Sequence, residues 1–165
     1  CLAIRDVIAS YVVEQEIGLK WPNDVVVVGR GKICGILVEV DGDNLIVGAG
    51  VNIASVSPLK DAVLPPVALD DFCKTCVTPQ MLAADYRTQL ARRYAAYAKT
   101  GFAPVRAEWL SYCVHRQQEV TVHCNTKAIS GVFTDLGLDG TLALLADDGL
   151  THHISTGDVE LMGQI

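Results

Sequence analysis

The segment 20–24 (KWPND) places a lysine, an amide and a carboxylate on five consecutive residues. Pro22 fixes its own φ and forces Trp21 to be extended, so the polar residues that follow enter the β-branched run 25–28 on a rigid turn. Such a set would hold a phosphate and its Mg²⁺. The alternative is a polar turn that only leads into a strand.

The segment 31–37 (GKICGIL) places Lys32 at the mouth of a strand that otherwise alternates apolar residues. Gly35, inside that strand, leaves room for the close approach of a ligand or of another backbone. A lysine at this position would bind an anion that develops in a transition state. The alternative is a solvated lysine beside a turn, with Gly35 as a bulge.

The segment 48–53 (GAGVNI) has two glycines on either side of Ala49, directly after a strand. It is not a dinucleotide fingerprint, because Ile53 stands where the last glycine of GxGxxG would be. The glycines would let a flat ring lie close to the backbone, with Asn52 reading its hydrogen-bonding edge. The alternative is a β-bulge followed by a capping asparagine.

Six cysteines are present, and Cys73 and Cys76 have CxxC spacing. A zinc site would need a second ligand pair, for which residues 113–115 and 123–124 offer poor spacing. Without a secretory signal, we interpret the cysteines as incidental free thiols of a cytoplasmic protein.

The elements that must position these motifs follow from periodicity and turn residues. Residues 2–14 have helical spacing, which Gly18 breaks, and strands follow over 25–28, over 33–40 and from 45, as an antiparallel meander. Thr78 is typical of an N-cap and Pro79 of a first helical position, so a helix is predicted over 79–99. Its predicted apolar face consists of Leu82, Tyr86, Leu90 and Tyr94.

A further helix is predicted over 105–112, and the chain becomes rich in short β-runs after His115. About five strands in about 50 residues are typical of a small barrel. The runs are Val120–His123, Ile129–Thr134, Thr141–Leu145, Thr151–Ile154 and Val159–Met162.

Composition limits the function classes. Half of the 165 residues are hydrophobic, the net charge is −6 and the pI is about 5.0, without a basic stripe. Nucleic-acid binding needs clustered Lys and Arg, so it is not predicted through this chain. No apolar run reaches the ~20 residues of a membrane span. The chain starts without Met in the middle of a helical pattern, which predicts a truncation.

The motifs KWPND, GKxxGIL and VGxGxN, in this order on consecutive strands, resemble those of the biotin protein ligases. The resemblance covers nearly the whole chain and implies an α+β fold. Residues 1–114 would be the C-terminal part of a catalytic domain of the biotin/lipoate ligase type, with a mixed arrangement of sheet and helices. Residues 115–165 would be a small SH3-like β-barrel.

The resemblance also implies the activity of a biotin--[acetyl-CoA-carboxylase] ligase. Such enzymes join biotin to ATP, with Mg²⁺, and form biotinoyl-5′-adenylate and pyrophosphate. They then transfer the biotinoyl group to a lysine in the biotin carboxyl carrier domain of a carboxylase. A homodimer would be compatible with the resemblance.

Motif by motif, the resemblance assigns roles to six residues. Lys32 matches the essential catalytic lysine, which contacts the biotin carboxylate and the adenylate phosphate. Gly35 keeps the strand open beside the ligand, and Asn52 lies near the adenine. The remaining three belong to the triphosphate end of the site, with Asp24 as the metal ligand: Lys20, Asn23 and Asp24.

The family's glycine- and arginine-rich loop and most strands of its biotin pocket lie upstream of KWPND and are absent from this sequence. Alone, the chain is therefore expected to bind nucleotide weakly and to catalyse little. The alternative is a non-catalytic module for carrier recognition or dimerisation. A biotin-dependent repressor would also be a ligase, and it would need a DNA-binding domain upstream.

Overall fold

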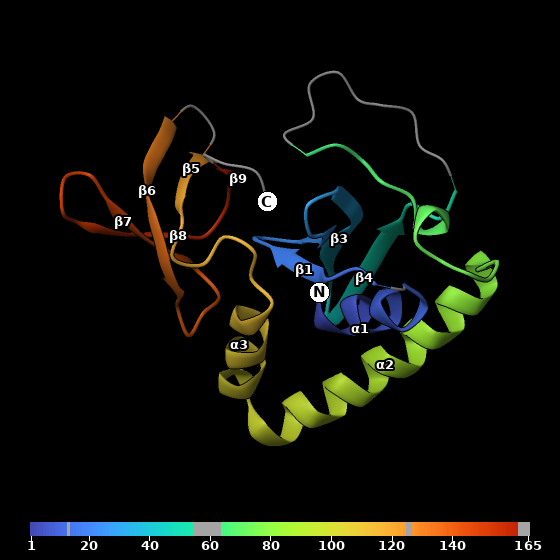
Figure 1. The fold of residues 1–165 in the computed structure, drawn as a ribbon. Helices are drawn as coiled ribbons and strands as arrows, with labels where there is room; N and C mark the ends of the chain where they lie inside the picture. The colour runs from blue at the N-terminus through green and yellow to red at the C-terminus, as the bar shows by residue number, and fades with distance from the viewer. Residues whose placement is uncertain (13, 55–63, 125–126, 162–165) are drawn as a thin grey trace. The chain divides into compact units, whose positions relative to one another are not determined.

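A computed structural model describes the fold of the chain (Figure 1). The described residues are 1–12, 14–54, 64–124 and 127–161. They form an α+β structure with two separate antiparallel sheets, as predicted. Among the described residues, no helix combines the length and the apolar character needed to cross a membrane.

The chain divides into two compact units. The N-terminal unit comprises Cys1–Leu19 and Asn23–Ala95, and the C-terminal unit comprises Lys20–Pro22 and Ala96–Ile165. The first three residues of the KWPND motif thus pack with the second half of the chain. The family-based domain division after residue 114 stays a prediction.

The N-terminal unit has a four-stranded sheet in the order β1-β2-β3-β4. Its strands are β1 (Ile17–Lys20), β2 (Asp24–Val27), β3 (Gly31–Asp41) and β4 (Asn44–Val51). The meander from β2 to β4 is antiparallel, which confirms the pattern seen in the sequence. Strand β1 was not predicted, because all four of its residues are buried and the alternation that reveals a half-buried strand is missing.

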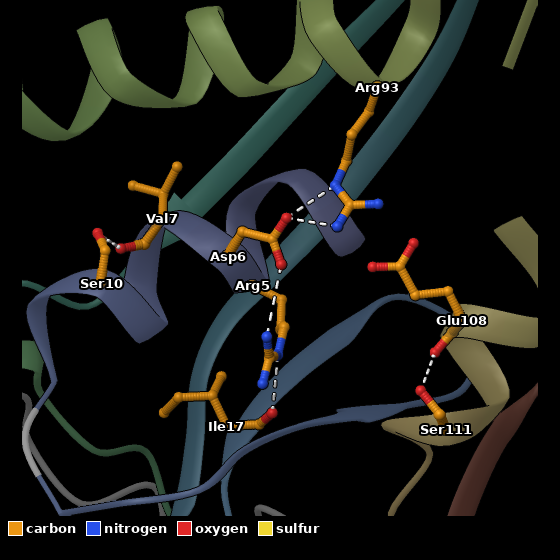
Figure 2. Close-up of polar contacts among 8 residues, drawn as sticks. All are labelled: Arg5, Asp6, Val7, Ser10, Ile17, Arg93, Glu108 and Ser111. Carbon is orange, nitrogen blue, oxygen red and sulfur yellow. Dashed lines mark hydrogen bonds and ion pairs between the residues drawn. The ribbon is translucent and has the colours of Figure 1, made fainter. Parts of the chain in front are cut away.

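The N-terminal helix α1 (Leu2–Tyr11) buries its apolar face and forms an ion pair through its polar face. Leu2, Ile4 and Ile8 are buried. On the polar side, Asp6 forms an ion pair with Arg93 of the long helix α2 (Figure 2). Helix α1 is therefore linked to α2 by an ion pair.

The long helix α2 (Pro79–Thr100) begins as predicted. The Thr78 hydroxyl accepts a hydrogen bond from the Met81 amide at 3.3 Å, so Thr78 is the N-cap. The predicted apolar face is only partly covered: Leu82 is buried, whereas Tyr94 is 65% exposed. Helix periodicity identifies a face but not how much of its length another element covers.

The C-terminal unit contains α3 (Phe102–Ser111) and a five-stranded antiparallel sheet. The strand order is β8-β7-β6-β5-β9. The strands are β5 (Glu119–Cys124), β6 (Lys127–Leu136), β7 (Leu142–Ala146), β8 (Thr151–Ile154) and β9 (Asp158–Leu161). The predicted end of the last strand, Met162, lies outside the described residues. Fully buried side chains of this sheet include Phe133, Leu142 and Leu144.

The sequence predicted a small barrel, and among the described residues the C-terminal sheet is not closed by hydrogen bonds. Its edge strands are β8 and β9, and within the described residues no ladder joins them to each other. Only residues 155–157 link these two edges, and that link reaches about 14 Å from Ile154 to Asp158. If the sheet were flat, its edge strands β8 and β9 would lie about 19 Å apart. The sheet must therefore curl towards a barrel without closing by hydrogen bonds.

Candidate functional site

Asp24, Lys32 and Gly35, three residues from two separate motifs, meet on adjacent strands of the N-terminal unit. Asp24 on β2 faces Gly35 on β3 in the strand register. The Lys32 ammonium lies 2.6 Å from a carboxylate oxygen of Asp24. The Asp24 side chain is 11% exposed and that of Lys32 is 41% exposed, so the cation remains accessible to a ligand.

The missing side chain of Gly35 makes room for Lys32. A Cβ at position 35 would lie 3.2 Å from both Cε and Nζ of Lys32, and 3.6 Å from the Asp24 carboxylate. The lysine side chain therefore folds back over the glycine to reach Asp24. The absence of a side chain at Gly35 therefore permits the contact between Lys32 and Asp24.

A hollow of about 470 Å³ adjoins these residues on the sheet. Its floor is largely backbone, because Gly35 pairs with Gly50 across β3 and β4, and Gly48 pairs with Leu37. The lining consists of Asn23, Gly35, Ile36, Leu37, Gly48, Ala49 and Gly50. A surface to which three glycines and Ala49 contribute mainly backbone suits a flat ring.

The two asparagines of the motifs are engaged with the backbone of β3. The Asn23 side-chain nitrogen donates to the Ile36 carbonyl at 2.7 Å, and the Asn23 carbonyl accepts from the Ile36 amide at 2.9 Å. The Asn52 side-chain nitrogen donates to the Lys32 carbonyl at 3.3 Å. Asn23 lines the hollow, whereas Asn52 is not among its lining residues within the described chain. Asn52 instead fixes the backbone that carries Lys32.

Lys20 has a different environment from Asp24 and Lys32. In the C-terminal unit, its ammonium donates to the Asp158 carboxylate at 2.6 Å, and only 2% of its side chain is exposed. Trp21 is held beside it, with its indole nitrogen donating to the Gly140 carbonyl at 3.3 Å. The structure thus pairs the buried Lys20 ammonium with a carboxylate that is 60% exposed, which fixes the start of the KWPND turn.

His115 completes the anchoring of this turn. Its Nε2 accepts a hydrogen bond from the Trp21 amide at 3.4 Å, and its ring packs against Phe133 and edge-on against Trp109. Burial, and then the positive charge of Lys20, lower the pKa of His115 from 6.5 to about 3. His115 is therefore neutral at physiological pH.

Sequence reasoning missed the roles of Asp158 and His115. Asp158 lies 138 positions from Lys20, and no spacing rule connects the two. His115 appeared in the sequence only as one possible partner for zinc. A lone histidine between a helix and a β-rich segment gives no sign that it will be buried.

The cysteines do not form a reactive or metal-binding centre among the described residues. Burial raises the pKa of the Cys113 thiol to about 11 and that of Cys34 to about 12, so both are protonated at neutral pH. No group of three or more potential metal ligands occurs in the part of the chain that the structure describes. Cys73 and Cys76 form no disulfide in the structure.

The ion pair of Lys20 leads to a stability prediction. Asp158→Asn is expected to lower the free energy of unfolding of the C-terminal unit by about 1–2 kcal/mol, because it leaves a buried ammonium without its carboxylate. The measurement is urea unfolding followed by tryptophan fluorescence, since Trp21 and Trp109, the chain's two tryptophans, both belong to this unit.

The control for this prediction removes the charge as well as its partner. Adding Lys20→Met to Asp158→Asn is expected to recover part of the loss, because an apolar side chain of similar length tolerates burial. A double variant that is less stable than Asp158→Asn would show that Lys20 does not depend on Asp158.

Comparison with known proteins gives a consistent result. No family model matches the chain. The chain is 30% identical over 141 residues to a biotin--[acetyl-CoA-carboxylase] ligase of Paracoccus denitrificans, and the match covers 81% of this chain and 58% of that protein. It is 27% identical over 163 residues to the bifunctional ligase/repressor BirA of Bacillus subtilis, with 87% and 46% covered. The chain thus spans about half the length of these relatives.

Solved structures show the same fold. The biotin protein ligase of Aquifex aeolicus superimposes with a TM-score of 0.82 at 21% identity, and the match covers 99% of this chain and 72% of that one. The same protein in complex with biotin and ATP gives a TM-score of 0.80, with 99% and 68% covered.

Proposed function

Since the chain belongs to the biotin protein ligase family, we propose that it contributes the nucleotide end of an adenylate-forming site. The reaction is the ATP-dependent joining of biotin, through biotinoyl-5′-adenylate, to a lysine of a carboxylase carrier domain. The observation that carries the proposal is the Asp24–Lys32 pair beside the glycine-floored hollow. It combines a cation for an anionic substrate with a surface for a flat ring.

Each group has a task in this chemistry. The Lys32 ammonium would stabilise negative charge on the biotin carboxylate and on the adenylate phosphate, in a site where Asp24 is largely shielded from water. The backbone floor formed by Gly48 and Gly50 would take the ring of a ligand. Asn52 would act by holding the Lys32 carbonyl, and through it the position of the ammonium.

Asp24 fits a role in holding Mg²⁺. The ion takes oxygen ligands, and it is usually bound by one or two carboxylates together with substrate phosphates and water. Asp24 supplies one carboxylate next to the hollow, and a site of this kind needs no cluster of three protein ligands. When bound, Mg²⁺ would neutralise charge on the phosphates of ATP.

The proposal extends to partners and location. The acceptor would be the biotin carboxyl carrier domain of a carboxylase in the cytoplasm. The proposal also includes a homodimer and an SH3-like fold of the C-terminal unit. The relative from Bacillus subtilis is a bifunctional ligase/repressor. We propose no nucleic-acid contact through this chain, because its net charge is −6.

A non-catalytic module for carrier recognition or dimerisation is the second candidate. The hairpin of β3 and β4 favours it, because several large apolar side chains there are more than half exposed. These are Leu37, Val38, Val40, Leu45 and Ile46. Apolar groups gathered on one hairpin are typical of a surface that another protein covers.

The deciding experiment measures ATP binding by calorimetry and biotin-dependent pyrophosphate release, each with Mg²⁺, on this chain. Omitting biotin is the control for release. Saturable ATP binding supports the proposed function even if turnover is slow. Absence of ATP binding at millimolar concentration, together with binding of a carrier domain or self-association, would instead support the second candidate.

A further inference from the structure

The backbone of Lys32 is held by a segment that follows β4 in the chain, residues 65–70, which we call the strap. The Lys32 amide donates to the Pro65 carbonyl at 2.9 Å, and the Lys32 carbonyl accepts from the Val67 amide at 2.9 Å. The same carbonyl also accepts a hydrogen bond from the Asn52 side-chain nitrogen at 3.3 Å. Three hydrogen bonds thus fix the backbone from which the Lys32 side chain starts.

The strap is stiff and is anchored at its far end. Lys32 and Pro66 form a parallel bridge, in which the residue at the centre of the strap directs its own backbone groups away from Lys32. A proline at this position therefore forfeits no hydrogen bond to β3, and it fixes its own φ. Further along, the Leu69 amide donates to the Asn52 carbonyl at 2.8 Å, and the Leu69 side chain is fully buried. The strap is therefore a fixed support for Lys32.

Gly31 allows the strap to approach Lys32 so closely. A Cβ at position 31 would lie 2.1 Å from the Pro65 carbonyl oxygen and 3.1 Å from the Val67 side chain. Cβ atoms essentially never come within 3.0 Å of a backbone atom, so the oxygen would have to move by at least about 0.9 Å. A displacement of this size stretches its 2.9 Å bond to the Lys32 amide beyond hydrogen-bond range. A side chain at position 31 thus separates the strap from Lys32.

We propose that Gly31 and the strap are positioning elements for the Lys32 ammonium. The inference rests on the proposed function and deepens it, since Lys32 is the group proposed to stabilise charge in the reaction. Within the described chain, no strap residue lines the hollow, so the strap acts through the Lys32 backbone. Misplacing a reacting group by about 1 Å can cost about 100-fold in rate, so this support matters for catalysis.

Amide hydrogen exchange tests the contact directly and without catalysis. The readout is the exchange rate of the Lys32 amide divided by that of the Ile36 amide, which donates to the Asn23 carbonyl in the same unit. This ratio cancels changes in global stability. Gly31→Ala is expected to raise it at least about tenfold, because the hydrogen bond to the strap opens. The matched control is Gly42→Ala, whose new Cβ would meet nothing within 4 Å; it is expected to leave the ratio within about twofold of wild type.

A second variant loosens the strap without a clash, so the test does not depend on the folding of Gly31→Ala. Pro66→Gly removes the fixed φ at the centre of the strap and no hydrogen bond to Lys32. It is expected to raise the exchange ratio about threefold, because glycine gains more conformational freedom when the strap opens.

Pyrophosphate release distinguishes positioning from a purely structural role. At saturating ATP and biotin, Gly31→Ala is expected to lower the rate at least about tenfold, while the Kd of ATP changes less than about threefold, because Lys32 acts mainly on the transition state. Adding Gly31→Ala to Lys32→Ala is expected to change the rate by less than about twofold, because Gly31 acts only through Lys32.

The outcomes separate this inference from the proposed function. An exchange ratio that stays at the wild-type value in Pro66→Gly and in folded Gly31→Ala overturns the inference. A raised ratio with an unchanged rate of release also overturns it, as does a further loss of about tenfold in the double variant. If the wild-type chain neither binds ATP nor releases pyrophosphate, the proposed function is contradicted, and the exchange ratio still decides whether the strap holds Lys32.

Discussion

Replacing Lys32 by alanine is expected to lower biotin-dependent pyrophosphate release at least about 100-fold. Removing a preorganised positive charge from a developing anion has effects of this size, because the transition state gains more from the charge than the ground state does. The measurement is the rate of release at saturating ATP and biotin, together with the Kd of ATP for the 165-residue chain.

The matched control is Lys74→Ala, which removes an exposed lysine from the same unit and should leave both quantities unchanged. Lys32→Ala is expected to lower the free energy of unfolding by about 1–2 kcal/mol, because it leaves the largely buried Asp24 carboxylate without the Lys32 ammonium, so the rates are compared under conditions in which urea unfolding shows each variant to be folded. Equal rates for the Lys32 and Lys74 variants would remove Lys32 from the proposed chemistry.

Acidification is expected to destabilise the C-terminal unit through His115. The unfolded chain protonates this histidine near its ordinary pKa of 6.5, whereas burial keeps it neutral in the folded protein down to a pKa of about 3. Unfolding therefore takes up a proton between these two pH values. The contribution of His115 to stability is complete above pH 6.5 and is lost as the pH falls, by up to about 1.4 kcal/mol per pH unit.

The measurement compares wild type with His115→Gln in urea at pH 7 and pH 5, again by tryptophan fluorescence. The variant should be less stable at pH 7, because a buried ring that packs on Phe133 is lost. The difference in unfolding free energy between the two proteins should shrink by about 2 kcal/mol at pH 5, because only in the wild type does unfolding take up a proton at His115. His153→Gln, an exposed control, should show the same pH dependence as wild type. A deficit of the same size at both pH values would contradict the assigned burial.

Local patterns in the sequence were sufficient for the elements whose causes are local. The N-cap Thr78 and Pro79 determined where α2 begins, and the glycine-bearing turns determined the meander of β2 to β4. These features depend on backbone preferences within a few residues, so the sequence alone predicts them. The motifs named Asp24 and Lys32 as candidates, and the antiparallel pairing of the consecutive strands β2 and β3 places their side chains in contact.

Only the tertiary structure decided features that depend on residues far apart in the chain. It paired Lys20 with Asp158, buried His115 beside Trp21, and showed that no ladder among the described residues joins the edge strands of the C-terminal sheet. It also showed that Gly35 makes room for Lys32 itself. Burial and long-range pairing depend on how the elements pack, which periodicity and motif spacing do not encode. The sequence thus determined which groups are candidates for chemistry, and the packing determined which of them are held by other residues of the protein.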